Sequence, residues 1–230
     1  MNEIPDKKDQ NSMKLMFNKI SKNYDLINNL MTFFLQKPIK SRALSGLSSN
    51  LENILDICTG TGDIAIMLAK KYPSANITAI DFSPEMLKIA KEKANEHKIR
   101  FIEGNALNLP FSDNSFDVCT ISFGLRNLPD KNAALKEIFR VLKTGGELLI
   151  IDLGKPKNKW LYPLILDKAV PFIGEIINGD KIPYKYLIES QKDYPSPQEI
   201  SKLLQTEGFS DIKNTDFLFG SISSIIAQKP

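Results

Sequence analysis

The chain has 230 residues, 42% of them hydrophobic, which is enough to bury one core of single-domain size. Its 30 basic and 27 acidic side chains leave a net charge of +3, too small for a protein that neutralises many nucleic-acid phosphates. With one histidine, His97, and two cysteines in apolar runs, no metal-binding cluster is predicted. Residues 2–9 lack the apolar stretch of a signal peptide, so we expect a cytoplasmic protein.

The first long pattern, residues 12–46, is helical. One face of it carries Phe17, Ile20, Tyr24, Ile27, Leu30 and Met31. Two interpretations are equally open: a helix packed on the edge of a sheet, or a lid over a ligand.

From residue 51 onward, short β-branched runs alternate with longer amphipathic runs, which predicts a parallel sheet covered by helices. Strands are expected at 53–58, 76–80, 99–103, 116–122 and 147–153, and helices at 63–71, 84–97, 132–142 and 197–207. Ser83 is expected to cap the second helix, with Pro84 in its first turn. A turn at Gly145-Gly146 is expected to separate the third helix from the strand that follows it.

Residues 155–193 interrupt this alternation with prolines, aromatics and lysines, which is typical of an inserted cap. Its most hydrophobic part, 160–177, is broken by charges and prolines and cannot span a membrane, although it could line an apolar pocket or touch a membrane surface. The last two runs, 212–217 and 221–228, are expected to form an antiparallel strand pair joined at Gly220.

A glycine turn follows the first strand. Gly60-x-Gly62 before a helix lets the backbone approach a ligand closely. Both a dinucleotide and S-adenosylmethionine are bound on such turns. Ala65 stands where a dinucleotide fingerprint has its third glycine, and the looser form of that fingerprint allows alanine. Spacing alone therefore leaves both ligands open.

Acidic residues favour S-adenosylmethionine. Asp56 precedes the turn, and Asp63 begins the helix, where it would repel a pyrophosphate but tolerate a sulfonium with an α-amino group. Asp81, at the end of the second strand, is placed to accept hydrogen bonds from both ribose hydroxyls. A capping role for Asp81 is the alternative, and it is disfavoured because Ser83 already supplies the cap of the next helix. Asn105-Ala106 follows the third strand, where an amide can meet the adenine edge, although an ordinary turn asparagine is the alternative.

Further motifs extend over nearly the whole chain. They are Phe17-x-x-Ile20-x-x-x-Tyr24-Asp25-x-x-Asn28, Asn105-Ala106-x-x-Leu109-Pro110-Phe111, Thr120-Ile121-Ser122-Phe123-Gly124-Leu125-Arg126-Asn127, Arg140-Val141-Leu142-Lys143-x-Gly145-Gly146 and Tyr184-x-Tyr186-Leu187-x-x-Ser190. With the glycine turn, this set resembles the quinone-biosynthetic C-methyltransferases that act on demethylmenaquinol and on the related polyprenyl benzoquinol.

The resemblance implies an α/β, Rossmann-like class I methyltransferase whose seven-stranded, mostly parallel sheet has its last strand antiparallel. We assign 1–50 to an N-terminal helical lid and 51–230 to the S-adenosylmethionine-dependent methyltransferase domain, with the cap insertion at 155–193 after strand five. The expected cofactor-binding residues are Asp56, Thr59, Gly60, Thr61, Gly62, Asp81, Phe82, Asn105, Ala106 and Ser122.

Several positions depart from the family pattern. Thr59 stands where glycine is usual, and Gln36 and Ile39 stand where histidine and tryptophan are usual. Asp152-Leu153-Gly154 replaces the usual glutamate and serine, and a histidine near the C-terminal end is missing. These departures bear on which quinol is used more than on the reaction type.

Methylating a ring carbon requires ionisation of the neighbouring phenol, whose pKa is about 10, so the site must stabilise the aryloxide or supply a base. Arg126 is the candidate cation, its alternative being a structural ion pair. Tyr24 and Tyr184 are candidates for orienting the hydroxyl, their alternative being packing. Asp152 is the candidate base, and a role as a cap or as an acid on the cofactor side is at least as well founded.

The favoured substrate is demethylmenaquinol, with the cap shaping a channel for the polyprenyl tail. Another small molecule, including a polyprenyl benzoquinol of ubiquinone synthesis, is the alternative. A nucleic-acid methyltransferase is disfavoured, because Ser122-Phe123-Gly124-Leu125 stands where enzymes that methylate exocyclic nitrogens have an Asn/Asp-Pro-Pro-aromatic run. Contact with the inner face of the membrane and a homodimer are left open.

Overall fold

The computed structural model describes residues 6, 8–32, 34–155, 182–192 and 194–230. Its N-terminal segment forms three helices, α1 (Gln10–Ile20), α2 (Tyr24–Met31) and α3 (Gln36–Leu44), with a 3-10 turn at Ser21–Asn23. The expected single helical pattern is therefore broken between α2 and α3. The break has a local cause, since Phe34 has a left-handed backbone with φ of 62°.

Seven strands form one sheet in the order β3-β2-β1-β4-β5-β7-β6. Their bounds are β1 (Asn53–Ile57), β2 (Asn76–Asp81), β3 (Ile99–Glu103), β4 (Phe116–Ser122), β5 (Leu142–Leu153), β6 (Ser210–Phe217) and β7 (Ile222–Gln228). The strands β1 to β5 pair in parallel, whereas β7 is antiparallel to both β5 and β6. The predicted seven-stranded sheet with an antiparallel last strand is confirmed, as is the predicted β6–β7 pair.

The helices between the strands begin near the predicted residues. They are α4 (Asp63–Lys71), α5 (Pro84–Ala94), α6 (Lys131–Val141) and α9 (Pro197–Thr206). Ser83 caps α5 as predicted, its hydroxyl accepting a hydrogen bond from the backbone N–H of Met86 at 3.2 Å. The helix ends at Ala94, earlier than predicted, because Asn95 leaves the helical conformation.

The prediction of a turn at Gly145-Gly146 is wrong, because both glycines lie inside β5. Helix α6 runs directly into this strand, whose pairing with β4 shifts register between Phe116 and Val118. Gly145 has φ of 78°, and a Cβ on Gly146 would lie 2.8 Å from the Lys143 carbonyl oxygen. The glycines therefore mark an irregularity within a strand, which local sequence does not distinguish from a turn.

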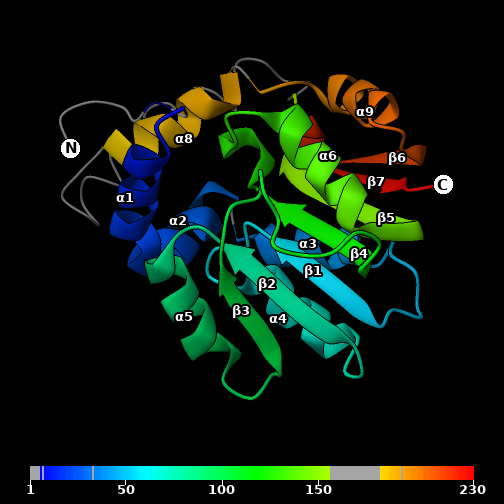
Figure 1. Ribbon diagram of the computed structural model, residues 1–230. Helices are drawn as coiled ribbons and strands as arrows, with labels where there is room; N and C mark the ends of the chain where they lie inside the picture. The colour runs from blue at the N-terminus through cyan, green and yellow to red at the C-terminus, as the bar shows by residue number, and fades with distance from the viewer. Residues whose placement is uncertain (1–5, 7, 33, 156–181, 193) are drawn as a thin grey trace.

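Apolar clusters cover both faces of the sheet. On one face Leu55 and Ile57 pack with residues of α6 and α9, and on the other Ile54 packs with residues of α3 and α4. Neighbouring residues of β1 thus point to opposite faces, as the alternation of a strand requires. The arrowheads of β2 and β4 point towards the side where α1 and α2 lie (Figure 1).

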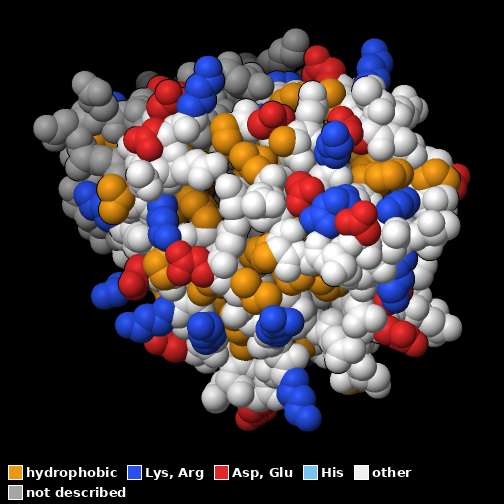
Figure 2. All heavy atoms as spheres, viewed as in Figure 1, with side chains coloured by type: hydrophobic (Ala, Val, Ile, Leu, Met, Phe, Trp, Pro, Cys, Tyr) orange, Lys and Arg blue, Asp and Glu red, His pale blue; other side chains and the backbone are white. Residues whose placement is uncertain are grey.

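Helix α8 (Ile182–Lys192) falls within the range 155–193 predicted to form a cap; residues 156–181 and 193 lie outside the described part of the chain. In the ranges that are described, no helix combines the length and the apolar character needed to cross a bilayer. On the face shown in Figure 2, basic and acidic side chains are scattered together around smaller apolar areas.

Candidate active site

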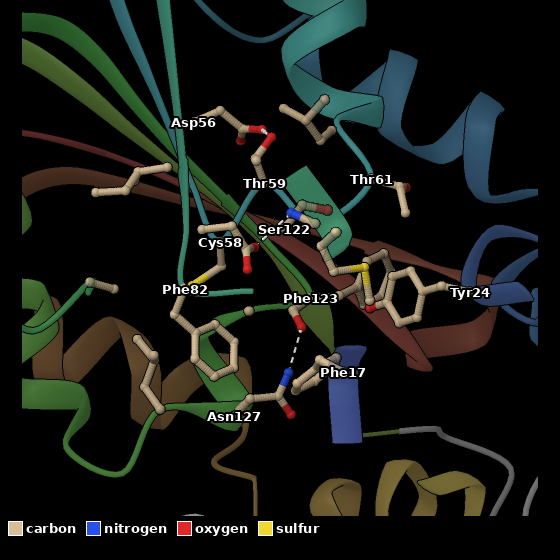
Figure 3. Close-up of a pocket in the computed structure, with 18 of the residues that line it drawn as sticks. Phe17, Tyr24, Asp56, Cys58, Thr59, Thr61, Phe82, Ser122, Phe123 and Asn127 are labelled. Atoms are coloured by element: carbon tan, nitrogen blue, oxygen red, sulfur yellow. Dashed lines mark hydrogen bonds between the residues drawn. The ribbon is translucent and has the colours of Figure 1, made fainter. Parts of the chain in front are cut away.

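A pocket lies at the carboxyl ends of β1, β2 and β4, where parallel sheets bind ligands. The strand-end side is lined by residues of the glycine turn and of the loops after β2, β3 and β4. The facing wall comes from the N-terminal helices and consists of Gln10, Met13, Phe17, Tyr24, Asp25, Asn28 and Lys40. Figure 3 shows Phe17 and Tyr24 at the pocket together with Thr59 and Phe82.

The two glycines of the turn differ in what surrounds them. Both have a left-handed backbone, with φ of 56° at Gly60 and 82° at Gly62. A Cβ on Gly60 would meet nothing closer than Tyr24, at 4.0 Å, whereas one on Gly62 would lie 2.9 Å from the Cβ of Ala90 in α5. Gly60 lines the pocket and Gly62 does not. Gly62 therefore permits close packing of the turn on α5.

Asp56 is buried at the base of the turn. Its carboxylate accepts hydrogen bonds from the hydroxyls of Thr59 and Thr120, each at 2.6 Å. Burial raises the pKa of Asp56 to about 6, and the two hydroxyls oppose this shift. Thr59, which replaces the usual glycine, has no left-handed backbone, so glycine is not required there. Its hydroxyl turns towards Asp56, as Figure 3 shows.

Asp81 ends β2 and is 6% exposed. One carboxylate oxygen accepts from the Gly60 N–H at 2.7 Å and the other from the Ser83 N–H at 2.9 Å. Burial raises its pKa to about 6, while these backbone N–H groups oppose the shift. The carboxylate thus joins the glycine turn to the start of α5, and it also lines the pocket.

Phe82, Asn105, Ala106 and Ser122 all line the same pocket. The Asn105 side-chain oxygen accepts from the Leu107 N–H at 2.9 Å, so part of this amide serves its own turn. The Ser122 hydroxyl is buried and has no hydrogen-bond partner among the described residues. Such an unsatisfied group is costly unless a ligand completes it.

Charged side chains join the N-terminal wall to the turn. Asp25 accepts from the Thr61 hydroxyl at 2.5 Å and from the Lys93 ammonium at 2.6 Å. Asp63, which starts α4, pairs with Lys93 and with Lys40 of α3. Burial tends to raise the pKa of Asp63, but the two lysines outweigh it and the pKa is lowered.

Of the four residues expected to be catalytic, only Tyr24 lines the pocket within the described part of the chain. Arg126 and Asp152 form a buried ion pair, with Nη1 and Oδ1 separated by 2.9 Å and exposures of 4% and 2%. This is the structural ion pair weighed as the alternative for Arg126. The Tyr184 side chain lies outside the described residues, whereas the neighbouring Tyr186 donates to the Asn127 side chain at 3.1 Å.

Two charged residues of the pocket were not expected there from the sequence: Asp25, which appeared only within a motif, and Lys40. Both come from helices whose placement against the glycine turn has no local signal. The four-residue spacing of Gln36 and Lys40 was a usable signal, because residues four apart on a helix are neighbours on its surface. The structure joins these two side chains by a 3.1 Å hydrogen bond.

Comparisons with known proteins find relatives that match nearly the whole chain. The demethylmenaquinone methyltransferase of Thermus thermophilus is 37% identical over 94% of this chain and 100% of its own. The ubiquinone/menaquinone biosynthesis C-methyltransferase UbiE of Rhizobium rhizogenes is 35% identical, over 95% of this chain and 89% of its own. Among solved structures, a SAM-dependent methyltransferase of Thermotoga maritima matches with a TM-score of 0.69 at 21% identity, covering 94% of this chain and 99% of its own.

At this identity the solved structure supports the fold alone. The family assignment comes from sequence, because the model of the ubiE/COQ5 methyltransferase family matches residues 4–229, almost the entire chain. The chain therefore belongs to the ubiE/COQ5 methyltransferase family.

Proposed function

We propose that this protein methylates a ring carbon of a polyprenyl hydroquinone, converting demethylmenaquinol to menaquinol with S-adenosylmethionine as the methyl donor. The observation that carries the proposal is the pocket itself. It is lined by nine of the ten residues expected to bind the cofactor, all except Gly62.

The pocket suits the chemistry of S-adenosylmethionine, which when bound supplies an electrophilic methyl group. Asp81 would accept hydrogen bonds from the ribose hydroxyls, and Asp56 with Gly60 would hold the α-ammonium group. Phe82, Asn105 and Ala106 would surround the adenine. The unsatisfied Ser122 hydroxyl supports the fit, because a ligand there would complete its hydrogen bonding.

Tyr24 is the described side chain best placed to contact the quinol hydroxyl. It lines the pocket, and burial raises its pKa, the effect of Arg126 in the opposite direction being smaller. At neutral pH Tyr24 therefore keeps its proton and acts as a hydrogen-bond donor, which suits a quinol oxygen that gains negative charge as it loses its proton.

Arg126 would act on that charge through the electrostatic field. It does not line the pocket, but its guanidinium lies 5.4 Å from the ring centroid of Phe123, which does. Asp152 fixes it by accepting from both the side chain and the backbone N–H of Arg126. We therefore assign Asp152 to holding Arg126 rather than to removing the phenolic proton.

The names of the relatives support the choice of quinol. The Thermus thermophilus relative is named for demethylmenaquinone, and so is that of Staphylococcus aureus, 36% identical over 93% of this chain. The Rhizobium rhizogenes relative is named for both ubiquinone and menaquinone, which makes a polyprenyl benzoquinol the second candidate.

The deciding experiment uses methyl-labelled S-adenosylmethionine and a panel of reduced quinols: demethylmenaquinols of two tail lengths and a polyprenyl benzoquinol. The quinols are kept reduced so that the electron-rich ring persists. Label is expected on the ring carbon of demethylmenaquinol. Transfer to no quinol, with transfer to another small molecule, would overturn the proposal.

The exposed apolar residues Leu15, Leu26, Phe34 and Leu35 all lie in the N-terminal helical segment, which also supplies one wall of the pocket. Since a polyprenyl substrate resides in a bilayer, we propose that this segment contacts the membrane surface. Replacing Leu15 and Phe34 with serine should reduce co-sedimentation with anionic vesicles. Phe219→Ser, which alters an even more exposed apolar residue at the other end of the chain, is the control. Equal loss in both variants would contradict this contact.

A homodimer stays a prediction, to be measured by sedimentation velocity.

A further inference from the structure

Acidic side chains outnumber basic ones in the lining of the pocket. Four carboxylates line it, those of Asp25, Asp56, Asp63 and Asp81. Among the described residues that line it, Lys40 alone has a cationic side chain. The methionine end of S-adenosylmethionine carries both an ammonium and a carboxylate, and a cationic N–H donor binds a carboxylate more strongly than a neutral N–H or O–H donor does.

Lys40 is buried, with its side chain 8% exposed. Its Nζ lies 3.1 Å from the Asp63 Oδ2 and 3.1 Å from the Gln36 Oε1. Gln36 is itself fixed, because its amide donates to the Asn29 side chain at 2.9 Å. A lysine ammonium has three N–H donors, and these two acceptors use two of them. Because Lys40 lines the pocket, its third N–H is the one left for a ligand.

The position of Lys40 relative to Asp56 supports a joint role. Burial is the main influence on the pKa of Asp56 and raises it, and the charge of Lys40 acts in the opposite direction. Both side chains also line the same pocket. The α-ammonium and α-carboxylate of the cofactor share one carbon atom, so the groups that bind them must be neighbours.

We propose that Lys40 binds the α-carboxylate of S-adenosylmethionine, next to the ammonium site at Asp56. This inference rests on the proposed cofactor, and it assigns a function to helix α3. That helix then supplies one part of the binding site, while Gln36 positions the lysine.

Lys93 is the natural comparison, because it also pairs with Asp63. However, it is 31% exposed, does not line the pocket, and already contacts Asp25 as well. If Lys40 only anchored α3 to α4, its removal and that of Lys93 should have similar consequences. If Lys40 binds the carboxylate, the consequences differ.

The test is a cycle that removes the charge of Lys40 from the protein and the carboxylate from the ligand, each separately. Wild type, Lys40→Met and the control Lys93→Met are titrated calorimetrically with S-adenosylhomocysteine and with its decarboxylated analogue, which keeps the amine. Lys40→Met should weaken binding of S-adenosylhomocysteine by about 10- to 100-fold, the range for a charged hydrogen bond. It should leave binding of the analogue unchanged or tighter. Lys93→Met should change both affinities by the same factor.

Equal losses for both ligands in Lys40→Met would overturn the assignment of Lys40 while leaving the cofactor in place. Failure of wild type to bind either ligand would instead overturn the proposed function. Urea unfolding checks each variant without ligand. If Lys40→Met does not unfold cooperatively, Lys40→Gln, which keeps an N–H donor for Asp63, replaces it in the same cycle.

Discussion

Asp56 and Asp81 lie at the ends of adjacent strands but are held by different kinds of donor. Two threonine hydroxyls bind Asp56, whereas backbone N–H groups bind Asp81. Backbone donors persist when a side chain is replaced, so the Asp81 site depends on Asp81 itself. The Asp56 site depends on Thr59 and Thr120 as well. Threonine at position 59 is compatible with a ligand-binding turn because its hydroxyl donates to Asp56.

Thr59→Val should therefore lower the free energy of unfolding at pH 7 by about 1–3 kcal/mol, because a buried carboxylate loses a hydroxyl donor. Thr59→Ser keeps the hydroxyl and should lose much less. Urea denaturation of the two variants measures the difference. Equal stability of Thr59→Val and wild type would mean that this hydrogen bond contributes nothing to folding.

Asp81→Asn should weaken S-adenosylhomocysteine binding by about tenfold or more, since the amide keeps one neutral acceptor but loses the other acceptor and the negative charge. A matched control is Asp117→Asn. Asp117 also accepts two backbone N–H groups, from Glu52 and Asn53, but it lies at the amino end of β4, away from the pocket. The control should lose stability and keep its affinity for the ligand. Unchanged affinity in Asp81→Asn would remove the ribose assignment.

At the scale of elements, the strands were predictable because β-branched runs and the glycine turn are local signals. The strand-end residues of the site were predictable for the same reason, since parallel strands bring Asp56, Asp81 and Ser122 to one edge. For the wall formed by α1 to α3, the sequence offered a helical lid over 1–50 as one interpretation, but not the contacts that such a lid makes. Helical periodicity identifies an apolar face but not which loop that face covers, so Asp25 and Lys40 could not be placed beside the turn.

The two kinds of glycine in the fold give a test of element packing. Gly62→Ala introduces both a left-handed alanine and a clash with Ala90 of α5, whereas Gly145→Ala introduces only the former, because nothing lies within 4 Å of its Cβ position. Gly145→Ala should lower the free energy of unfolding by about 1–2 kcal/mol. Gly62→Ala should lower it further, and chemical denaturation measures both. Equal losses would show that α5 yields to the extra methyl group without cost.

At the scale of the whole molecule, ionisable groups divide into two sets with opposite effects on stability. Asp63, Asp117 and Glu137 have lowered pKa values. Burial opposes the shift at the two aspartates, whereas at Glu137 the hydrogen bond from Arg140 is the main cause. Such groups stabilise the fold above their ordinary pKa of about 4, and this stabilisation is lost as the pH falls through the lowered values. Asp56 and Asp81 belong to the opposite set, because burial raises each pKa to about 6.

An acid with a raised pKa binds more protons in the folded state than in the unfolded state. Between about pH 4 and pH 6 the unfolded carboxyl is ionised while the folded one is protonated, so these two residues favour the fold less as the pH rises through that window. Their effect on the ligand has the opposite sign, because an ammonium and two ribose hydroxyls need ionised carboxylates. The stabilisation that S-adenosylhomocysteine confers against urea should thus be larger at pH 7 than at pH 5. Asp56→Asn with Asp81→Asn should remove most of that difference together with most of the affinity. A stabilisation by ligand that is the same at both pH values would mean that neither carboxylate titrates in contact with it.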